Sequence, residues 1–180
     1  MEAGGEGRES LGADVTGRPA RVHRPPRIAV CGGGAPDAEE MREAEAAGRA
    51  IARAGAILVC GGLGGVMAAA CRGAADAGGT TIGVLPGRDP ADANPWVGVP
   101  LATGMGDARN ALVVSFADAV VAVGGAWGTL SEVALARVLE RPVVLLRPGL
   151  TRGLPLPVAA DAAAAVDEAL AACGVRMAAG

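Results

Sequence analysis

The chain has 180 residues, carries a formal net charge of -3 and is 51% hydrophobic but only 2% aromatic. This length fits one domain, whose core must be built mainly from Ala, Val, Leu and Ile. All 16 basic residues are arginine, which excludes a Schiff-base lysine, such as one holding pyridoxal phosphate, and the lysine of a Walker A loop. The chain has no strongly basic segment, so nucleic-acid binding is not predicted.

Other site classes are also disfavoured by composition. The only histidine, His23, lies in a polar leading segment, so we expect no histidine-based metal site and no histidine acid–base catalysis. The four cysteines form no CxxC pair, and Cys31 and Cys60 each end an apolar run, where a small buried thiol is expected. Without a disulfide framework, a signal peptide or a membrane-length apolar stretch, the sequence predicts a cytoplasmic protein with no membrane partner.

The first part of the chain changes character at Arg27. Residues 1–26 are rich in Gly, Arg, Glu and Pro and lack periodicity, which predicts a disordered leader whose arginines are either solvated or contact an acidic partner. Residues 27–180 then form a single predicted domain. Its first elements are a strand at 28–31, a helix at 37–54, a strand at 57–60, a helix at 66–77 and a strand at 80–85.

The second part continues the alternation. It holds a loop at 88–96, a weaker strand at 97–102, a helix at 107–116, a strand at 119–123, a helix at 129–139, a strand at 142–146 and, after a Pro-rich loop, a helix at 161–172. Strands that alternate with helices and read as continuous apolar runs predict an α/β, Rossmann-like three-layer sandwich around a mostly parallel sheet.

Three strands end in glycine-rich turns, at 32–34, 61–65 and 124–128. The carboxyl ends of parallel strands share one rim, where ligands bind, and such turns let backbone N–H groups approach an anion beside the next helix. Each turn alone also fits a tight β–α connection, but together they predict a phosphate-binding rim. The expected binding positions are Gly33, Gly34, Gly61, Gly62, Gly65, Gly124, Gly125, Ala126, Trp127, Gly128 and Thr129.

An ordinary dinucleotide site is disfavoured, because the fingerprint G-x-G-x-x-G fails twice. In a motif that starts at Gly32, the last glycine would fall at position 37, where the chain has Asp37. In a motif that starts at Gly62, it would fall at position 67, where the chain has Met67. The strand that ends at Cys60 is not followed by an acid that would hold a ribose diol.

Three blocks resemble the Lonely Guy (LOG) superfamily, which was long mislabelled "lysine decarboxylase". They are GGLGGVM at 61–67, TGMGDARN at 103–110 and GGAWGTLSE at 124–132, and the resemblance covers roughly residues 27–146. It implies a Rossmann-like fold, commonly a homodimer. In the enzymes it also implies hydrolysis of nucleoside 5′-monophosphates to a free base and ribose 5-phosphate, with no cofactor required.

The chain departs from the superfamily pattern P-G-G-x-G-T-x-x-E. Gly124 replaces the proline, Ala126 replaces the second glycine, and Ser131 replaces the acid before the final glutamate. The superfamily's Arg-Lys pair reads Arg109-Asn110. These departures resemble a bacterial subgroup similar to molybdenum cofactor carrier proteins.

Two functions therefore stay open. One is a nucleoside 5′-monophosphate phosphoribohydrolase, and the other is a non-catalytic carrier or sensor of a nucleotide or of a phosphate-bearing, molybdopterin-type cofactor. Because Arg109 and Glu132 are retained, the sequence slightly favours the hydrolase. Arg109 would orient the phosphoribosyl group, and Glu132 would place a carboxylate beside the ribose.

Several of these residues also have structural interpretations. Arg109 fits a surface ion pair, with Asp107 as a candidate partner, and Asp107 itself fits a helix N-cap. Thr129 and Glu132 have the spacing of a capping box. Trp127 either stacks on a ligand ring or closes its turn.

Two further positions complete the expected ligand-binding set. Asn110 offers neutral hydrogen bonds where the enzymes often have a cation. Met67 is included among the ligand-binding positions, although core packing is its more ordinary role.

Overall fold

The computed structural model describes residues 24–174, so the expected leader falls outside the described residues up to position 23. The strands are β1 (Arg27–Gly32), β2 (Ile57–Cys60), β3 (Thr81–Leu85), β4 (Val99–Ala102), β5 (Ala119–Val123), β6 (Val143–Leu146) and β7 (Val158–Ala159). The helices are α1 (Ala38–Arg53), α2 (Val66–Asp76), α3 (Asn110–Phe116), α4 (Trp127–Val138) and α5 (Ala162–Ala172), with short 3₁₀ turns η1 (Pro90–Asp92) and η2 (Gly106–Arg109).

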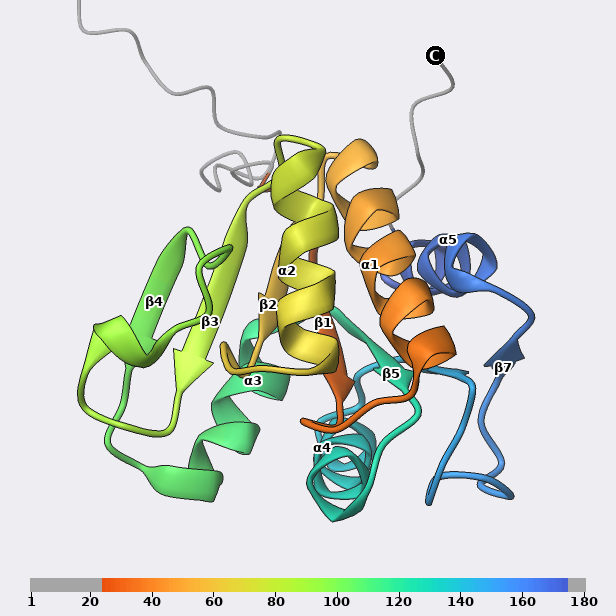
Figure 1. Ribbon diagram of the computed structural model, residues 1–180. Coiled ribbons are helices and arrows are strands. Elements are labelled where there is room, and N and C mark those ends of the chain that lie inside the picture. Colours follow the sequence, from red (N-terminus) through yellow and green to blue (C-terminus); the bar gives the residue numbers. More distant parts are fainter. Residues whose placement is uncertain (1–23, 175–180) are drawn as a thin grey trace, which may run out of the picture.

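The sheet has the order β4-β3-β2-β1-β5-β6-β7, and every neighbouring pair is parallel (Figure 1). The chain starts at β1, moves outward to β4, and then returns to the other side of β1 with β5. The predicted Rossmann-like α/β fold is confirmed. This order places a topological switch point between β1 and β5, where open α/β sheets bind ligands beyond the carboxyl ends of the strands.

Two helical layers cover the sheet. Side chains of α1, α2 and α5 pack on one face in a core that includes Ile28 and Val30 of β1. Helices α3 and α4 pack on the other face in a second core that includes Ala29 and Cys31 of the same strand (Figure 1). The alternation along β1 follows from the two-residue period of a strand. Among residues 24–174, no helix combines the length and apolarity needed to span a membrane.

Some predicted boundaries differ from the structure. The predicted helix at 107–116 is divided into η2 and α3, and α4 begins at Trp127, two residues before the predicted start. Sequence periodicity missed β7, whose two residues give too short a pattern to detect. The predicted loop at 88–96 includes η1, and the weaker strand at 97–102 narrows to β4.

Helices α1 and α2 approach each other through glycine. A Cβ on Gly48 would lie 1.9 Å from the Ala70 carbonyl oxygen, and a Cβ on Gly73 would lie 1.9 Å from the Glu45 carbonyl oxygen. Because both obstacles are backbone atoms, no side-chain rotation removes them. The reciprocal contacts show that the two helices pack closely on the same face of the sheet.

Gly48→Ala is expected to lower the free energy of unfolding by about 3 kcal/mol, because overpacking forces the two backbones apart. In an exposed helix the same change would instead stabilise by about 1 kcal/mol. Urea unfolding followed by circular dichroism measures the difference. Gly64→Ala is the matched control, since a Cβ there meets no atom within 4 Å. Equal stability of the two variants would contradict the close approach.

Asp118 joins the segment before β1 to the start of β5. Its carboxylate accepts hydrogen bonds from both Nη atoms of Arg24, each at 2.6 Å, and from the Arg27 backbone N–H at 2.9 Å. These contacts, led by the Arg24 hydrogen bond, lower the pKa of Asp118 to about 2. Residues 24–26 are thereby held against the sheet, and the Pro26 carbonyl also accepts from the Ile57 N–H at 2.8 Å.

Asp118→Asn is expected to lower the free energy of unfolding at pH 7 by about 1 kcal/mol, because charge-assisted hydrogen bonds become neutral ones. A depressed carboxyl pKa stabilises the fold above the ordinary value of 3.8, and this stabilisation is lost as the pH falls towards 2. The difference between wild type and variant should therefore shrink between pH 4 and pH 2. Denaturant titrations at pH 7 and pH 2.5 test this, and an undiminished difference would contradict it.

Candidate phosphate-binding site

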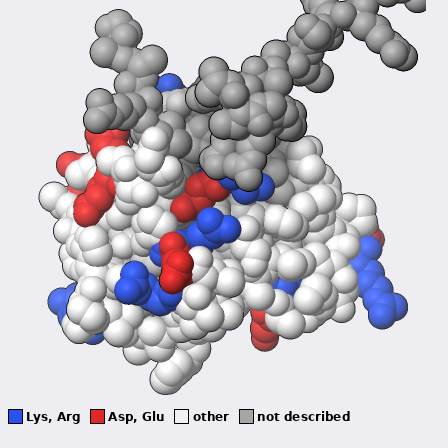
Figure 2. Space-filling view, turned by 180° about the vertical axis from the view of Figure 1, so that it is seen from behind, with Lys and Arg blue, Asp and Glu red and all other residues white. Residues whose placement is uncertain are grey.

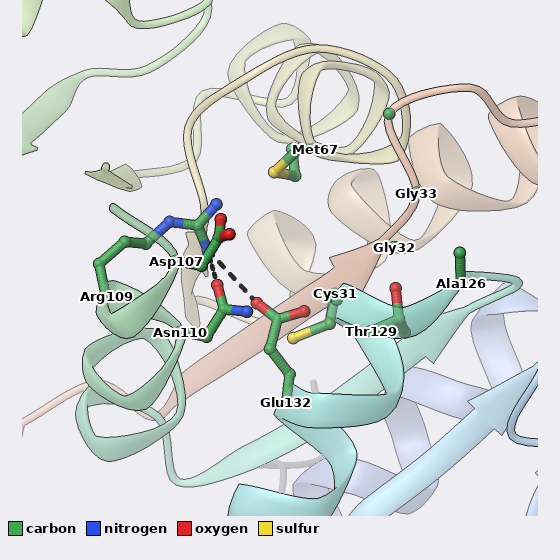
Figure 3. Close-up of a pocket in the computed structure, with 12 residues that line it drawn as sticks. Cys31, Gly32, Gly33, Met67, Asp107, Arg109, Asn110, Ala126, Thr129 and Glu132 are labelled. Carbon is green, nitrogen blue, oxygen red and sulfur yellow. Dashed lines mark hydrogen bonds and ion pairs between the residues drawn. The ribbon is translucent and has the colours of Figure 1, made fainter. Parts of the chain in front are cut away.

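A pocket of about 210 Å³ lies at the carboxyl ends of β1 and β5, at the switch point of the sheet (Figure 3). Its walls come from the end of β1 and the loop after it, from α2, from η2 and α3, and from the start of α4. It is lined by Cys31, Gly32, Gly33, Gly34, Met67, Asp107, Arg109, Asn110, Ala126, Gly128, Thr129 and Glu132.

The first turn of α4 borders this pocket with unpaired backbone N–H groups. Its N-cap is Ala126, which has no side-chain oxygen to accept from them. The first N–H groups of a helix lack partners within the helix and carry positive partial charge. A Cβ on Gly128 would meet no atom within 4 Å, so the space around this turn is open. The turn is therefore suited to a phosphate group.

The predicted capping box of Thr129 and Glu132 is wrong. Because α4 begins at Trp127, Thr129 is already the third helical residue and Glu132 lies in the second turn. The capping box that the structure does show lies at α1, where Asp37 accepts from the Glu40 N–H and the Glu40 side chain accepts from the Asp37 N–H. Capping therefore provides no reason for a carboxylate at position 132.

Arg109 extends a buried cation into the pocket. The residue is only 8% exposed, and its Nη1 lies 2.5 Å from Asn110 Oδ1 and 3.5 Å from Glu132 Oε1. Atoms of the guanidinium would lie 2.4 to 2.7 Å from a Cβ on Gly61, so a side chain there would displace the guanidinium from this position. The buried Nε has no hydrogen-bond partner. The alternative of a surface ion pair with Asp107 is thus wrong.

Glu132 points into the same space and is 6% exposed (Figure 3). Burial raises its pKa from 4.5 to about 7, while Arg109 and the Cys31 thiol act to lower it. Burial, followed by the charge of Glu132, raises the pKa of Cys31 well above its ordinary value. Near neutral pH the pocket therefore holds a protonated thiol and a carboxyl group that is able to gain or lose a proton.

Asn110 joins Arg109 to α4. Its Nδ2 donates to Ser131 Oγ at 3.1 Å, and Ser131 Oγ donates to the Gly128 carbonyl at 2.7 Å. The two positions at which the chain departs from the superfamily's charged residues are thus hydrogen-bonded to each other. Asp107 also borders the pocket, but it is not an N-cap, because η2 already begins at Gly106 and has no side-chain cap.

The other expected binding residues lie at different depths around the pocket. Met67 lines it and also packs against the core beneath α1 and α2. The side chain of Trp127 is 76% exposed and does not line the pocket, so closure of the turn by this ring is wrong and stacking on a ligand stays a prediction. Behind the lining, glycines form the supporting turns: Gly61, Gly62, Gly65, Gly124 and Gly125.

Three lining residues were absent from the predicted set. Cys31 and Gly32 end β1, and Asp107 precedes Arg109 by two positions. The rule that ligands bind at the carboxyl ends of parallel strands would have indicated the first two. Cys31 was not predicted to line the pocket, because its apolar neighbours in the strand indicated a core position.

Gly124 shows why the proline of the superfamily pattern does not fit this chain. Its φ of +55° is inaccessible to proline, and its N–H donates to the Leu146 carbonyl at 2.9 Å. A Cβ would also collide with the Glu40 carboxylate, 1.9 Å away. A proline at this position would require another backbone conformation after β5.

Comparison with known proteins agrees with this architecture. The chain is 42% identical over 122 residues to an uncharacterized protein of Archaeoglobus fulgidus, covering 68% of this chain and 80% of that one. It is similar to the molybdenum cofactor binding protein of Rippkaea orientalis, with 35% identity, a TM-score of 0.78, and coverage of 81% of this chain and 96% of that one.

The molybdenum cofactor carrier protein of Chlamydomonas reinhardtii is similar as well. The identity is 39% and the TM-score 0.77, with 84% of this chain and 99% of that chain covered. The profile of the SLOG cluster4 family matches residues 25–172. The expected likeness to the LOG superfamily and to molybdenum cofactor carriers is confirmed, and the chain belongs to the SLOG cluster4 family.

Proposed function

We propose that this protein binds a phosphate-bearing small molecule of the molybdenum cofactor class and carries it without chemical change. One observation carries the proposal: the uncapped first turn of α4 and the buried Arg109 border the same pocket. Backbone N–H groups at a helix start and a guanidinium are both donors suited to an anionic group. Similarity to a cofactor binding protein and a cofactor carrier protein supports this choice of ligand.

A nucleoside 5′-monophosphate phosphoribohydrolase is the second candidate. It is favoured by the pairing of Arg109 with Glu132 and by the raised pKa of that carboxyl, about 7. A base with this pKa is able to accept a proton from water near neutral pH. In this reaction the water oxygen would bond to the ribose C1′ as the bond to the base breaks, and the departing base would take a proton. We expect this hydrolysis to require no cofactor.

The two functions differ in the fate of the ligand. Purified full-length protein would be titrated calorimetrically with AMP, GMP and molybdenum cofactor released from a molybdoenzyme, and each mixture would then be resolved by chromatography. The carrier proposal expects saturable binding of the cofactor and its recovery intact, with no free base. Sustained release of adenine or guanine would reject the carrier proposal in favour of the hydrolase. If none of these molecules binds, both functions would be rejected.

We further propose that the protein forms a homodimer through the face that α3 and α4 cover. Large apolar side chains are exposed there, led by Val138 at 78%, with Phe116 and Leu139 nearby in the sequence of these helices. Figure 2 shows uncharged areas on this face around a group of charged side chains near its middle. Exposed apolar patches of this kind mark protein interfaces, and twofold pairing is the commonest closed assembly.

Val138→Asp is expected to convert the dimer to a monomer, because a carboxylate would be buried at the interface without a partner. Size-exclusion chromatography with light scattering measures the mass of the assembly. Val158→Asp on β7, which is also exposed, is the control and should leave the dimer intact. A monomeric wild type would reject this proposal.

A further inference from the structure

A continuous run of hydrogen bonds connects the buried cation with the first turn of α4. Arg109 Nη1 donates to Asn110 Oδ1 at 2.5 Å, Asn110 Nδ2 donates to Ser131 Oγ at 3.1 Å, and Ser131 Oγ donates to the Gly128 carbonyl at 2.7 Å. Arg109 only donates, whereas Asn110 and Ser131 each accept one of these bonds and donate the next, so the amide and the hydroxyl have matched partners. We call Asn110 and Ser131, with these three bonds, the neutral relay.

The neutral relay joins segments that are 21 residues apart. Asn110 begins α3, and Ser131 lies in α4. Among the described residues, the only other polar side-chain link between η2 or α3 and α4 is the longer ion pair of Arg109 with Glu132, at 3.5 Å. The relay and the buried ion pair are therefore the two polar links that connect the cation with α4.

The guanidinium of Arg109 is restrained from three directions. Nη1 lies between two acceptors, Asn110 Oδ1 and Glu132 Oε1, and its face lies against Gly61. Restraining a long side chain before the ligand arrives lowers the entropy lost on binding. Ser131 in turn holds the Asn110 amide in the orientation that presents its oxygen to Arg109.

We propose that Asn110 and Ser131 are positioning residues, which hold Arg109 and the first turn of α4 as one preorganised anion-binding unit. This inference rests on the proposed function for its role in binding, while its structural part concerns the orientation of Arg109 with or without ligand. The neutral relay performs this task without adding charge to the pocket.

The chain supplies a matched comparison for a purely structural role. Ser115 on α3 donates from its hydroxyl to the Ala111 carbonyl at 2.6 Å, just as Ser131 donates to Gly128. Such bonds from serine to the preceding helical turn are common and by themselves have little to do with ligands. Ser115 is exposed and does not line the pocket, so Ser115→Ala removes the same kind of bond away from the site.

The first test measures binding of AMP and of inorganic phosphate to the full-length protein by calorimetry. Ser131→Ala and Asn110→Ala should each weaken binding about fivefold, the scale of one hydrogen bond of about 1 kcal/mol. The double variant should also lose about fivefold, because both changes break the same relay. Ser131→Thr, which keeps a hydroxyl, should bind like the wild type, and so should Ser115→Ala.

The second test needs no ligand. In ¹⁵N-labelled protein, NMR correlation of the guanidinium groups should show separate, slowly exchanging Nη signals for Arg109, assigned by their absence in Arg109→Lys. These signals should merge in Ser131→Ala and Asn110→Ala as the guanidinium gains rotation, and they should stay separate in Ser115→Ala.

The two tests separate the inference from the proposed function. If the wild type binds neither AMP nor phosphate, the proposed anion-binding role of the pocket is rejected for these two molecules. The NMR result still decides whether the relay restrains Arg109. Unchanged Arg109 signals in Ser131→Ala would overturn the inference. Fully additive losses of about 25-fold in the double variant would also overturn it, because the two residues would then act independently.

Discussion

Glu132→Gln is expected to flatten the dependence of stability on pH between pH 5 and pH 8. Burial raises the pKa of Glu132 from 4.5 to about 7, so the folded protein keeps a proton that the unfolded chain releases. The corresponding stabilisation is complete below pH 4.5 and is lost as the pH rises through 7. For the wild type this amounts to a loss of about 2 to 3 kcal/mol between pH 5 and pH 8.

Urea unfolding of wild type and variant at several pH values between 5 and 8 measures this effect. Glutamine has nearly the same shape as glutamic acid and does not ionise, so packing is preserved. Glu140→Gln serves as the control, because Glu140 is an exposed carboxylate that follows the same helix and should leave the slope unchanged. If the free energy of unfolding of Glu132→Gln falls with pH as steeply as that of the wild type, the raised pKa of Glu132 would be contradicted.

The same variant has a second readout. If the protein proves to hydrolyse nucleoside monophosphates, Glu132→Gln should lower turnover by about 10² to 10⁴, the usual contribution of general acid–base catalysis. Loss of turnover without loss of stability would then indicate that the carboxylate takes part in the reaction, because the structure shows that Glu132 is not a capping residue.

Arg109→Met is expected to weaken the binding of AMP and of inorganic phosphate by roughly 10- to 100-fold, which corresponds to about 1.5 to 3 kcal/mol for hydrogen bonds to a charged group. Methionine preserves much of the apolar stem but removes the cation that lies over Gly61 and beside Glu132. Calorimetric titration at pH 6, where Glu132 is mostly protonated, avoids the added effect of an unpaired carboxylate.

Arg137→Met is the matched control for this experiment. Arg137 lies at the exposed carboxyl-terminal end of α4, so its removal changes the net charge by the same amount away from the pocket. If Arg109→Met and Arg137→Met bind AMP and phosphate equally well, Arg109 would contribute to binding only through the net charge of the protein. Arg109→Lys should recover part of the lost affinity, since a lysine restores charge but not the fork of donors that meets Asn110.

Glu132 illustrates where sequence reasoning reached its limit. The spacing of Thr129 and Glu132 matches a capping box, yet α4 begins two residues earlier than the pattern predicts. The start of a helix depends on where the preceding turn releases the chain, and here that turn follows Gly124, whose N–H is held by Leu146 of β6. Position along the sequence alone could not reveal this tertiary hydrogen bond.

Arg109 and Asn110 show the same limit in another form. The motif indicated both residues as ligand-facing, and both line the pocket. Their partners, Glu132 and Ser131, come from another helix. Because pairing between helices depends on how the helices pack, the sequence left open a surface ion pair with Asp107 that the burial of Arg109 excludes.

The sequence by itself determined the alternation of strands and helices, the parallel sheet and the three glycine-rich turns on one rim, because these follow from local periodicity and from the backbone freedom of glycine. The absence of lysine likewise removed whole classes of chemistry. Only the tertiary structure decided that Cys31 and Glu132 meet, that burial raises the pKa of Glu132 to about 7, and that Asn110 joins Arg109 to α4. These properties arise from distances and solvent exclusion between segments far apart in the chain, which no local pattern specifies.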